Sequence, residues 1–261
     1  MACSACPCPT TYQARGRGEG TLRILAWNIL HGGSARRLPE VVLSLLAHHP
    51  DVVVLSEYRP RLGGQIRGVL GDHGLAHQAA TPTPAGSNGL LIASRPPLSV
   101  RADGPTEHPA ARRPCWRDRW LEVRLPGLTL AGVHVPDDGR PTDRAAYWQS
   151  LLAFARARRD EAALLIGDFN TGRHRADEEG ATFSCTAQLG ALWTLGYRDA
   201  WRELNPDARE STWVSPVGGG FRIDAAHLSA PLLPRLRGAR HSDRERLGGV
   251  SDHSAVLVDL A

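Results

Sequence analysis

The feature that most constrains this chain is a repeated pattern in which a short apolar run of strand length ends in a carboxylate, amide or imidazole side chain. The run 52–56, with three consecutive valines, is followed directly by Glu57. Such a run predicts a strand buried on both faces, and the ends of neighbouring strands meet at one edge of a sheet, where clefts form. The polar residues at these positions are Asn28, Glu57, His134, Asp168, Asn170, Asp224, Asp252 and His253.

The order of the elements along the chain predicts an α/β fold. Several neighbouring strands are joined too briefly for a crossover helix, and Pro126-Gly127 indicates a hairpin. The arginine- and glycine-rich stretch 235–249 predicts an exposed loop. We therefore expect two mixed sheets with helices outside them, rather than one doubly wound sheet. The predicted strands are 22–27, 51–56, 89–94, 120–124, 128–135, 162–167, 221–228 and 254–260, and the predicted helices are 38–48, 142–158 and 189–195.

The length and composition are those of a globular protein. The 261 residues are 42% hydrophobic and 22% charged, so the chain can bury a sizeable core. We expect one domain over 21–261, preceded by a disordered tail over 1–20. The chain has no apolar stretch of the roughly 18 residues that span a membrane, and the tail has no apolar core of a secretory signal. We therefore expect a cytoplasmic monomer with no membrane or protein partner.

The basic residues of this chain are of one type. All 31 are arginine, and the net charge is +4. The planar guanidinium can bind a phosphate through two hydrogen bonds. A charge of this size is compatible with a polyanionic partner but does not require one. The absence of lysine also fits the codon usage of a GC-rich genome, so the charge alone does not decide the substrate.

The polar residues of the strand ends are typical ligands of a hard cation. Three acids and an asparagine brought together would repel one another unless a cation neutralised their charge. Their oxygen atoms, without a thiol among them, indicate Mg2+ or Mn2+ rather than zinc. A single polar residue at a strand end is equally an ordinary transition to a loop, so it is their number that indicates a site.

Six short segments that contain these residues occur in the order found in a known superfamily. They are Trp27-Asn28, Ser56-Glu57, Gly132-Val133-His134, Gly167-Asp168-Phe169-Asn170, Arg222-Ile223-Asp224 and Ser251-Asp252-His253. The sequence resembles, over about 22–260, the endonuclease/exonuclease/phosphatase superfamily, which contains exonuclease III-like DNA repair enzymes, DNase I, neutral sphingomyelinases and inositol polyphosphate phosphatases. The resemblance implies a DNase I-like, four-layer α/β sandwich of two mixed β-sheets flanked by helices, with the active site at one rim.

The resemblance also implies roles for the oxygen-bearing residues. Glu57 would be the principal metal carboxylate, with Asn28 beside it. Asp252 would join Glu57 or hold a second ion, and the ion would be Mg2+ or Mn2+. Asp168 and Asn170 would orient the attacking water and contact the scissile phosphate.

Two histidines complete the expected catalytic set. His253, paired with Asp224, would lie beside the phosphate, and the carboxylate would fix its tautomer and raise its basicity. His134 stands where the exonuclease III-like branch usually has a tyrosine, and resembles DNase I and the phosphoesterase branches there. Histidine is a good general acid near neutral pH, so catalysis is retained, whereas abasic-site specificity is no longer implied.

Substrate-binding residues are expected in two regions. Arg222 and Trp213 lie in segments that resemble the part of exonuclease III-like enzymes that frames a nucleic-acid groove. Trp193, Trp201 and Trp213 could stack on bases, but tryptophan beside apolar residues also predicts core packing. Arg113 belongs to a basic-aromatic patch that either contacts phosphates or forms the charged edge of a solvated strand. The patch consists of Arg112, Arg113, Trp116, Arg117, Arg119 and Trp120.

The sequence therefore predicts a divalent-metal-dependent hydrolase of phosphodiester bonds. DNA is the expected substrate, and the expected activity is that of an endonuclease or exonuclease in DNA repair. The alternative is a phosphatase or phosphodiesterase that acts on a small-molecule or lipid phosphoester, because the same fold carries many phosphate chemistries. A non-catalytic binding module would have lost some of the expected ligands, and none is lost here.

Overall fold

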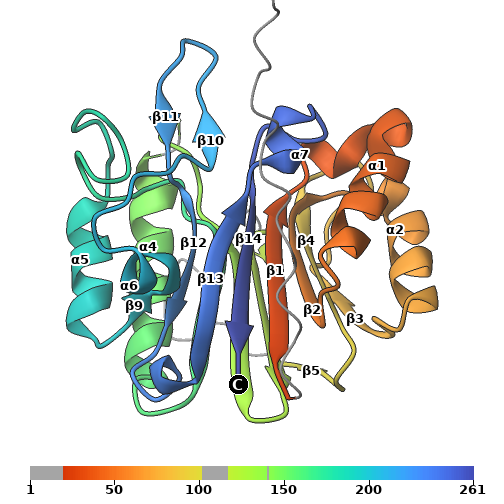
Figure 1. Ribbon diagram of the computed structural model, residues 1–261, viewed down its shortest axis with the longest axis horizontal. Helices are drawn as coiled ribbons and strands as arrows, with labels where there is room; N and C mark the ends of the chain where they lie inside the picture. Colours follow the sequence, from red (N-terminus) through yellow and green to blue (C-terminus); the bar gives the residue numbers. More distant parts are fainter. Residues whose placement is uncertain (1–19, 102–116, 140) are drawn as a thin grey trace, which may run out of the picture.

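Two six-stranded mixed β-sheets pack face to face, and helices cover the outer face of each sheet (Figure 1). The computed structural model describes residues 20–101, 117–139 and 141–261. The predicted tail over 1–20 therefore lies, except for Gly20, outside the described residues. The layers confirm the predicted four-layer α/β sandwich with two mixed sheets.

The first sheet contains the first and the last strand of the chain as neighbours. In spatial order its strands are β13 (Leu236–Ser242), β14 (Ala255–Leu260), β1 (Leu22–Asn28), β2 (Val52–Tyr58), β4 (Gly89–Ser94) and β3 (His77–Ala80). β1 pairs parallel with β2 and antiparallel with β14. The other pairs are antiparallel, and the parallel pair directs the ends of β1 and β2 to the same edge of the sheet.

The second sheet has the same kind of organisation. In spatial order its strands are β5 (Ser99–Val100), β6 (Trp120–Leu125), β7 (Leu128–His134), β8 (Ala163–Asp168), β12 (Asp224–Leu228) and β9 (Arg198–Asp199). β7 and β8 are parallel, and the remaining pairs are antiparallel. The ends of β7 and β8 therefore also lie at one edge.

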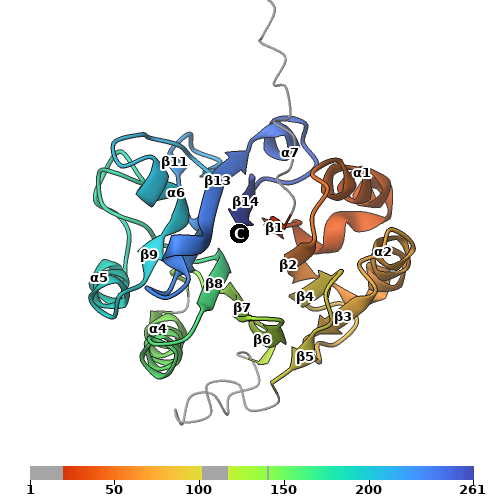
Figure 2. The same ribbon diagram turned by 60° about the horizontal axis from the view of Figure 1, so that its bottom comes forward.

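Two long helices cover each sheet from outside. They are α1 (Ser34–Ala47) and α2 (Pro60–Asp72) on the first sheet, and α4 (Pro141–Ala157) and α5 (Thr186–Thr194) on the second (Figures 1 and 2). The shorter elements are the helices η1 (His31–Gly33), α6 (Ala200–Leu204), η3 (Leu233–Arg235) and α7 (Arg244–Leu247), and a hairpin of β10 (Trp213–Val214) and β11 (Gly220–Phe221). Within the described ranges, every helix is too short or too polar to cross a lipid bilayer.

The valine-rich strand β2 explains why the sheets have an apolar layer on both sides. Val52 and Val54 pack between the two sheets, whereas Val53 and Leu55 pack against α1 and α2. All four side chains are at most 1% exposed, as the uninterrupted apolar run predicts. Burying each of them contributes about 1.5–3 kcal/mol relative to an exposed side chain.

The stretch 235–249 corrects one expectation, because it is not an exposed loop. It contains the edge strand β13, which pairs antiparallel with β14, and the one-turn helix α7. The side chains of β13 are mostly half-buried, and Arg240 pairs with Asp259 on the neighbouring strand. An edge strand is covered on fewer sides than a central one and favours charged residues, so it lacks the apolar pattern by which strands are recognised.

Candidate active site

The polar residues predicted at the strand ends lie at one rim of the sandwich, on the side away from the C-terminus (Figure 1). Asn28 ends β1, His134 ends β7 and Asp168 ends β8. Asp224 begins β12 and is paired directly with Asp168 across the two strands. The strand pairing of both sheets thus places these side chains at the same edge.

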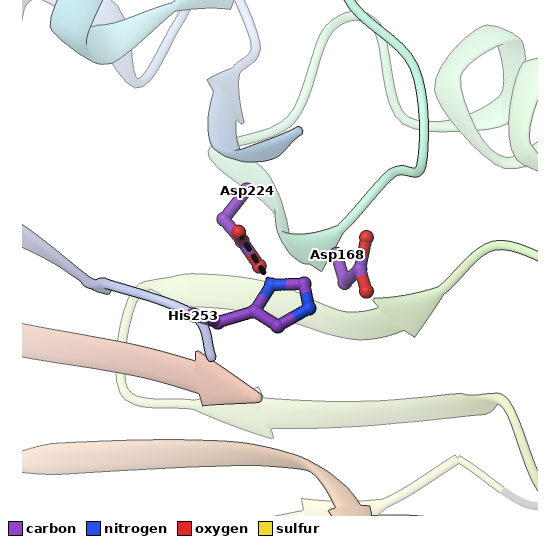
Figure 3. A group of neighbouring side chains, drawn as sticks. All are labelled: Asp168, Asp224 and His253. Carbon is purple, nitrogen blue, oxygen red and sulfur yellow. Dashed lines mark hydrogen bonds and ion pairs between the residues drawn. The ribbon is translucent and has the colours of Figure 1, made fainter. Parts of the chain in front are cut away.

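The centre of this rim is a buried cluster of two carboxylates and an imidazole (Figure 3). Nδ1 of His253 lies 2.8 Å from Oδ2 of Asp224. One side-chain atom each of Asp168, Asp224 and His253 lies within 4.8 Å of the other two. The second ring nitrogen of His253 points toward the side of Asp168 (Figure 3). The three side chains therefore act as one electrostatic unit.

The charge state of this cluster follows from burial and from the contacts within it. Burial alone would lower the pKa of His253, but the carboxylate of Asp224, with a smaller effect of Asp168, raises that pKa to about 10. Burial first, and then the negative charge of Asp224, raises the pKa of Asp168 to about 7. At neutral pH the imidazole is therefore protonated, and Asp168 can exchange a proton readily.

The turn that carries His253 is attached to the end of β1. The hydroxyl of Ser251 donates to the carbonyl oxygen of Asn28 at 2.6 Å and accepts from the backbone N–H of His253 at 3.2 Å. The indole N–H of Trp27 donates to the carbonyl oxygen of His253 at 3.0 Å. These buried bonds fix the histidine, which comes from the first sheet, against the acids of the second.

Asn28 links carboxylates from the two sheets. Its side-chain nitrogen donates to Oδ2 of Asp168 at 3.2 Å and to Oε1 of Glu57 at 3.5 Å. Its side-chain oxygen accepts from the backbone N–H of Leu30 at 3.1 Å. The predicted metal residues Asn28 and Glu57 are thus neighbours, and Glu57 is half-buried at the rim.

Asp252 has an unused acceptor at the same rim. Its Oδ2 accepts from the indole N–H of Trp213 at 3.1 Å. Its Oδ1 is buried and has no hydrogen-bond partner among the described residues. A buried carboxylate oxygen without a partner is costly, and a bound cation would satisfy it. Asp252 and Glu57 both offer carboxylate oxygens, the type of ligand that fits a hard divalent ion.

Asp168 and Asn170 owe their positions to an unusual backbone at the end of β8. Gly167 has a φ of 142°, and a Cβ there would lie 2.1 Å from the carbonyl oxygen of Val133. Asn170 has a φ of 49°. Its backbone N–H donates to Oδ1 of Asp168 at 2.9 Å, and its side-chain N–H donates to the carbonyl of Val135 at 2.8 Å. The turn thus orients the Asp168 carboxylate.

His134 lies on the other side of Asp168 and differs from His253 in its charge. Its Nε2 is 3.7 Å from Oδ2 of Asp168. Burial, followed by the positive charges of Arg119 and His253, holds the pKa of His134 well below its usual range. His134 is therefore neutral at pH 7, and the protonated imidazole of this site is His253. This differs from the expectation of a general acid at His134.

Arg222 lies in the interior of the protein and not on an exposed face, where a substrate contact was expected. It is 3% exposed, and its guanidinium binds Oδ1 of Asp177 at 2.8 Å and Oδ2 of Asp199 at 2.6 Å. Its positive charge lowers the pKa of Asp199 against the effect of burial. A guanidinium that neutralises two buried carboxylates is not available to a ligand.

The other predicted substrate contacts have different outcomes. Arg113, together with Arg112 and Trp116, lies outside the described residues. Trp120 and Trp201 are buried. Trp193, which lies in α5, is half-buried and packs against the apolar core between the second sheet and its helices. Trp213 is half-buried at the rim. In the basic-aromatic patch, Arg117 is exposed and Arg119 is half-buried.

The sequence analysis missed one histidine at this rim. His31 lies in the turn after β1, and both its backbone N–H and its ring Nδ1 are 2.7 Å from Oε2 of Glu57. A signal was present, because the imidazole stands three residues after Asn28 and directly before Gly32 and Gly33. The residue was overlooked because it lies in a turn rather than at a strand end.

Comparisons with known proteins agree with this arrangement. The 3′ phosphatase NExo from Neisseria, bound to a product DNA hairpin, is 22% identical over 92% of this chain and 99% of its own, with a TM-score of 0.74. The 3′-5′ exonuclease NExo from Neisseria meningitidis gives the same values. An AP endonuclease from Archaeoglobus fulgidus is 20% identical over 91% of this chain and 98% of its own, also with a TM-score of 0.74. These likenesses show the shared fold.

The sequence comparisons decide the family. A search of the curated proteins finds no match. The model of the endonuclease/exonuclease/phosphatase family matches residues 25–253, which is most of the chain and includes every residue of the rim described above. The protein therefore belongs to the endonuclease/exonuclease/phosphatase family.

Proposed function

We propose that this protein is a divalent-metal-dependent phosphoesterase that hydrolyses phosphodiester bonds in DNA. The observation that carries this function is the buried cluster of Asp168, Asp224 and His253 (Figure 3). It combines a carboxyl group able to take up a proton near neutral pH with an imidazole that is already protonated. Hydrolysis of a phosphodiester needs both a proton acceptor for the water and a donor for the leaving oxygen.

Glu57 and Asp252 would hold the metal ion, Mg2+ or Mn2+, with Asn28 beside Glu57. The unpartnered Oδ1 of Asp252, assessed among the described residues, supports this assignment. The ion, when bound, supplies positive charge that offsets the charge of the phosphate. A phosphodiester anion otherwise repels both the attacking water and the carboxylates of the rim.

The residues of the chain can carry out the proton transfers. Asp168 takes a proton from the water as the water oxygen attacks the phosphorus. The backbone N–H of Asn170 holds this carboxylate in place. As the bond to the leaving oxygen breaks, His253 gives its proton to that oxygen, and Asp224 keeps the imidazolium favourable until then. The neutral His134 beside Asp168 can hydrogen-bond a phosphate oxygen.

Three observations support DNA as the substrate. The structures with the same fold include a 3′ phosphatase bound to a DNA hairpin and an AP endonuclease. All 31 basic residues are arginine, the residue best suited to bidentate phosphate contacts. Nη1 of Arg119 is buried without a hydrogen-bond partner in the described part of the chain, and its charge acts on His134. Arg119 therefore adds positive charge near the rim, which favours an anionic substrate. We also propose that the enzyme acts as a monomer in the cytoplasm.

Hydrolysis assays with Mg2+ and with Mn2+ test this function. The substrates are supercoiled plasmid, an abasic-site duplex, a 3′-phosphate duplex and a panel of small phosphoesters. Glu57→Gln and His253→Ala are expected to abolish DNA cleavage, whereas Glu40→Gln, at an exposed position of α1, is the matched control and retains it. Cleavage of DNA should also weaken steeply with salt, since a polymer releases counterions on binding. Turnover limited to small phosphoesters would refute the DNA assignment and favour the phosphatase alternative.

A further inference from the structure

The turn that follows β1 adopts a backbone conformation that is rare for residues with side chains. From 30 to 34, every residue has a positive φ, between 44° and 77°. Leu30, His31 and Ser34 are not glycine, and such a conformation costs about 1–3 kcal/mol at each of them. Gly32 packs so closely on the next segment that a Cβ there would lie 2.8 Å from Cβ of Arg59. The turn is therefore held in place by its neighbours, as strained functional segments are.

This turn places His31 on the carboxylate of Glu57. The backbone N–H of His31 donates to Oε2 at 2.7 Å, and ring Nδ1 lies 2.7 Å from the same oxygen. Glu57 itself has a φ of 57°, and the pairing of β2 with β4 is irregular at this residue. Both partners of the contact thus occupy an unfavourable backbone conformation.

A third side chain, that of Asn88, offers a hydrogen-bond donor to the imidazole of His31. Nε of Arg59 donates to Oδ1 of Asn88 at 2.6 Å, and this bond directs the NH2 group of Asn88 toward His31. Nδ2 of Asn88 lies 3.2 Å from Nδ1 of His31. In the tautomer with a proton on Nδ1, that proton would be donated to Oε2 of Glu57, 2.7 Å away. In the tautomer with the proton on Nε2, Nδ1 accepts from the NH2 group of Asn88, and this is the form that can bind a cation.

In this tautomer, Nδ1 of His31 and Oε2 of Glu57 are two acceptors 2.7 Å apart. Two acceptors in contact repel each other, and a cation bound to both removes the repulsion. Ligands about 2.1 Å from an octahedral ion lie about 3.0 Å from one another, which is close to this separation. The His31 side chain is 56% exposed, so an ion can reach the pair from solvent.

We propose that Nδ1 of His31 is a ligand of the cation at Glu57 and makes the site prefer Mn2+ to Mg2+, an inference that rests on the proposed binding of a divalent ion by Glu57. Mg2+ takes oxygen ligands and gives up its water reluctantly. Imidazole nitrogen is a better ligand for first-row transition ions than for Mg2+. His31 thus selects among the ions that the carboxylates alone would accept.

The substitutions at His31 must tolerate a φ of 56°. Glycine adopts this conformation without strain and removes the ligand, and asparagine tolerates it and offers an amide oxygen in place of nitrogen. His73→Gly is the matched control, because His73 is exposed and its Nδ1 contacts the carbonyl of Val69 on its own helix. Circular dichroism and thermal unfolding establish that each variant folds.

The readouts are dissociation constants and a spectroscopic signature of the ligand. Calorimetric titration of the metal-free protein should show that His31→Gly weakens Mn2+ binding about 10–100-fold and Mg2+ binding less than about threefold. His31→Asn should lose the preference for Mn2+ while retaining Mg2+. Pulsed EPR of the Mn2+-loaded protein should detect nitrogen coupling in the wild type and in His73→Gly, and this coupling should be lost in His31→Gly.

Glu57→Gln separates this inference from the proposed function. If Glu57→Gln abolishes metal binding but His31→Gly changes neither the ratio of the two dissociation constants nor the nitrogen coupling, His31 is not a ligand, and only this inference fails. If Glu57→Gln leaves the binding of both ions unchanged, Glu57 does not hold the cation and the proposed metal site fails as well. DNA hydrolysis is not needed for either conclusion.

Discussion

Replacing Asp224 with asparagine tests whether this carboxylate keeps His253 protonated. The two side chains are 2.8 Å apart and buried, and Asp224 makes the main contribution that raises the pKa of His253 to about 10. Asparagine preserves the shape of the side chain but removes its charge. Since burial lowers the pKa of a histidine, we expect the pKa of His253 in Asp224→Asn to fall below 6.5, its unperturbed value.

The size of this effect can be worked out from the pKa. A fall from about 10 to 6.5 corresponds to about 5 kcal/mol in the preference for the protonated imidazole, at 1.36 kcal/mol per pKa unit. At pH 7 the imidazole of His253 is then charged in the wild type and neutral in the variant. Losing one preorganised charged donor costs about 10²–10³ in kcat. We expect a loss of this size on the preferred DNA substrate at pH 7.

The pH dependence of the free energy of unfolding tests the effect of Asp224→Asn independently. The pKa of His253 is higher in the folded than in the unfolded protein, so its ion pair stabilises the fold fully below pH 6.5 and progressively less as the pH rises toward 10. Asp224→Asn should therefore lower the free energy of unfolding more at pH 6 than at pH 10. Denaturant unfolding at the two pH values measures this difference.

The assay is an NMR titration of the ring proton of His253, combined with kcat measured from pH 5 to pH 9. Asp160→Asn is the matched control, because the side chain of Asp160 is 86% exposed and pairs with its neighbour Arg159. A pKa of His253 that stays above 9 in Asp224→Asn would refute the reasoning. A kcat within threefold of the wild type would show that the imidazolium is not used in the reaction.

Three further substitutions give distinct results. Without divalent ions, Asp168→Asn should raise the free energy of unfolding by up to about 4 kcal/mol at pH 8 and little at pH 4. The reason is that a carboxyl group whose pKa rises on folding destabilises the folded state above its unfolded pKa. Urea unfolding at both pH values measures this difference. Arg222→Met should lower that free energy by about 3–5 kcal/mol, since Asp199 loses its guanidinium partner and Asp177 is left with Arg202 alone, while KM of the folded enzyme is unchanged. Trp213→Phe keeps the ring but removes the N–H bound to Asp252, so calorimetry should show about tenfold weaker Mn2+ binding.

The strand ends were predictable because two local signals coincide there. An apolar run ends at Asp168, and the run 163–166 before it is fully buried. Strand length and burial fix where the chain leaves the sheet, and the parallel pairing of β7 with β8 then fixes which other ends are near. The family resemblance added the roles, which depend on the order of the segments rather than on any one of them.

The helix α2 and the strand β13 were not predictable in the same way. Four glycines interrupt the helical pattern of α2, at positions 63, 64, 68 and 71, and glycine is a poor helix former. α2 is stabilised by Ile66 and Leu70, which pack against the first sheet. β13 is stabilised by its pairing with β14. In both elements, tertiary contacts outweigh the local preference.

The environment of Arg222 could not be predicted from the sequence, because an arginine close to a predicted site residue suits two environments equally, the substrate surface and a buried ion pair. Two residues before Asp224, it was expected to face the substrate, but the chain from Arg222 into β12 is buried throughout. There it meets Asp177 and Asp199, which are 45 and 23 residues away in sequence. Only the folded chain reveals that these charges are compensated internally.

The place of His31 could not be predicted for a different reason, which is the unusual backbone conformation of its turn. A left-handed turn of five residues, three of them not glycine, has no local signal beyond Gly32 and Gly33. The turn depends on Arg59 and Asn88, which approach from other segments. The strain can persist only if the contacts that it creates are worth more than it costs. A metal ion shared by His31 and Glu57 would supply that compensation, so removing the ion should loosen this turn before any other part of the rim.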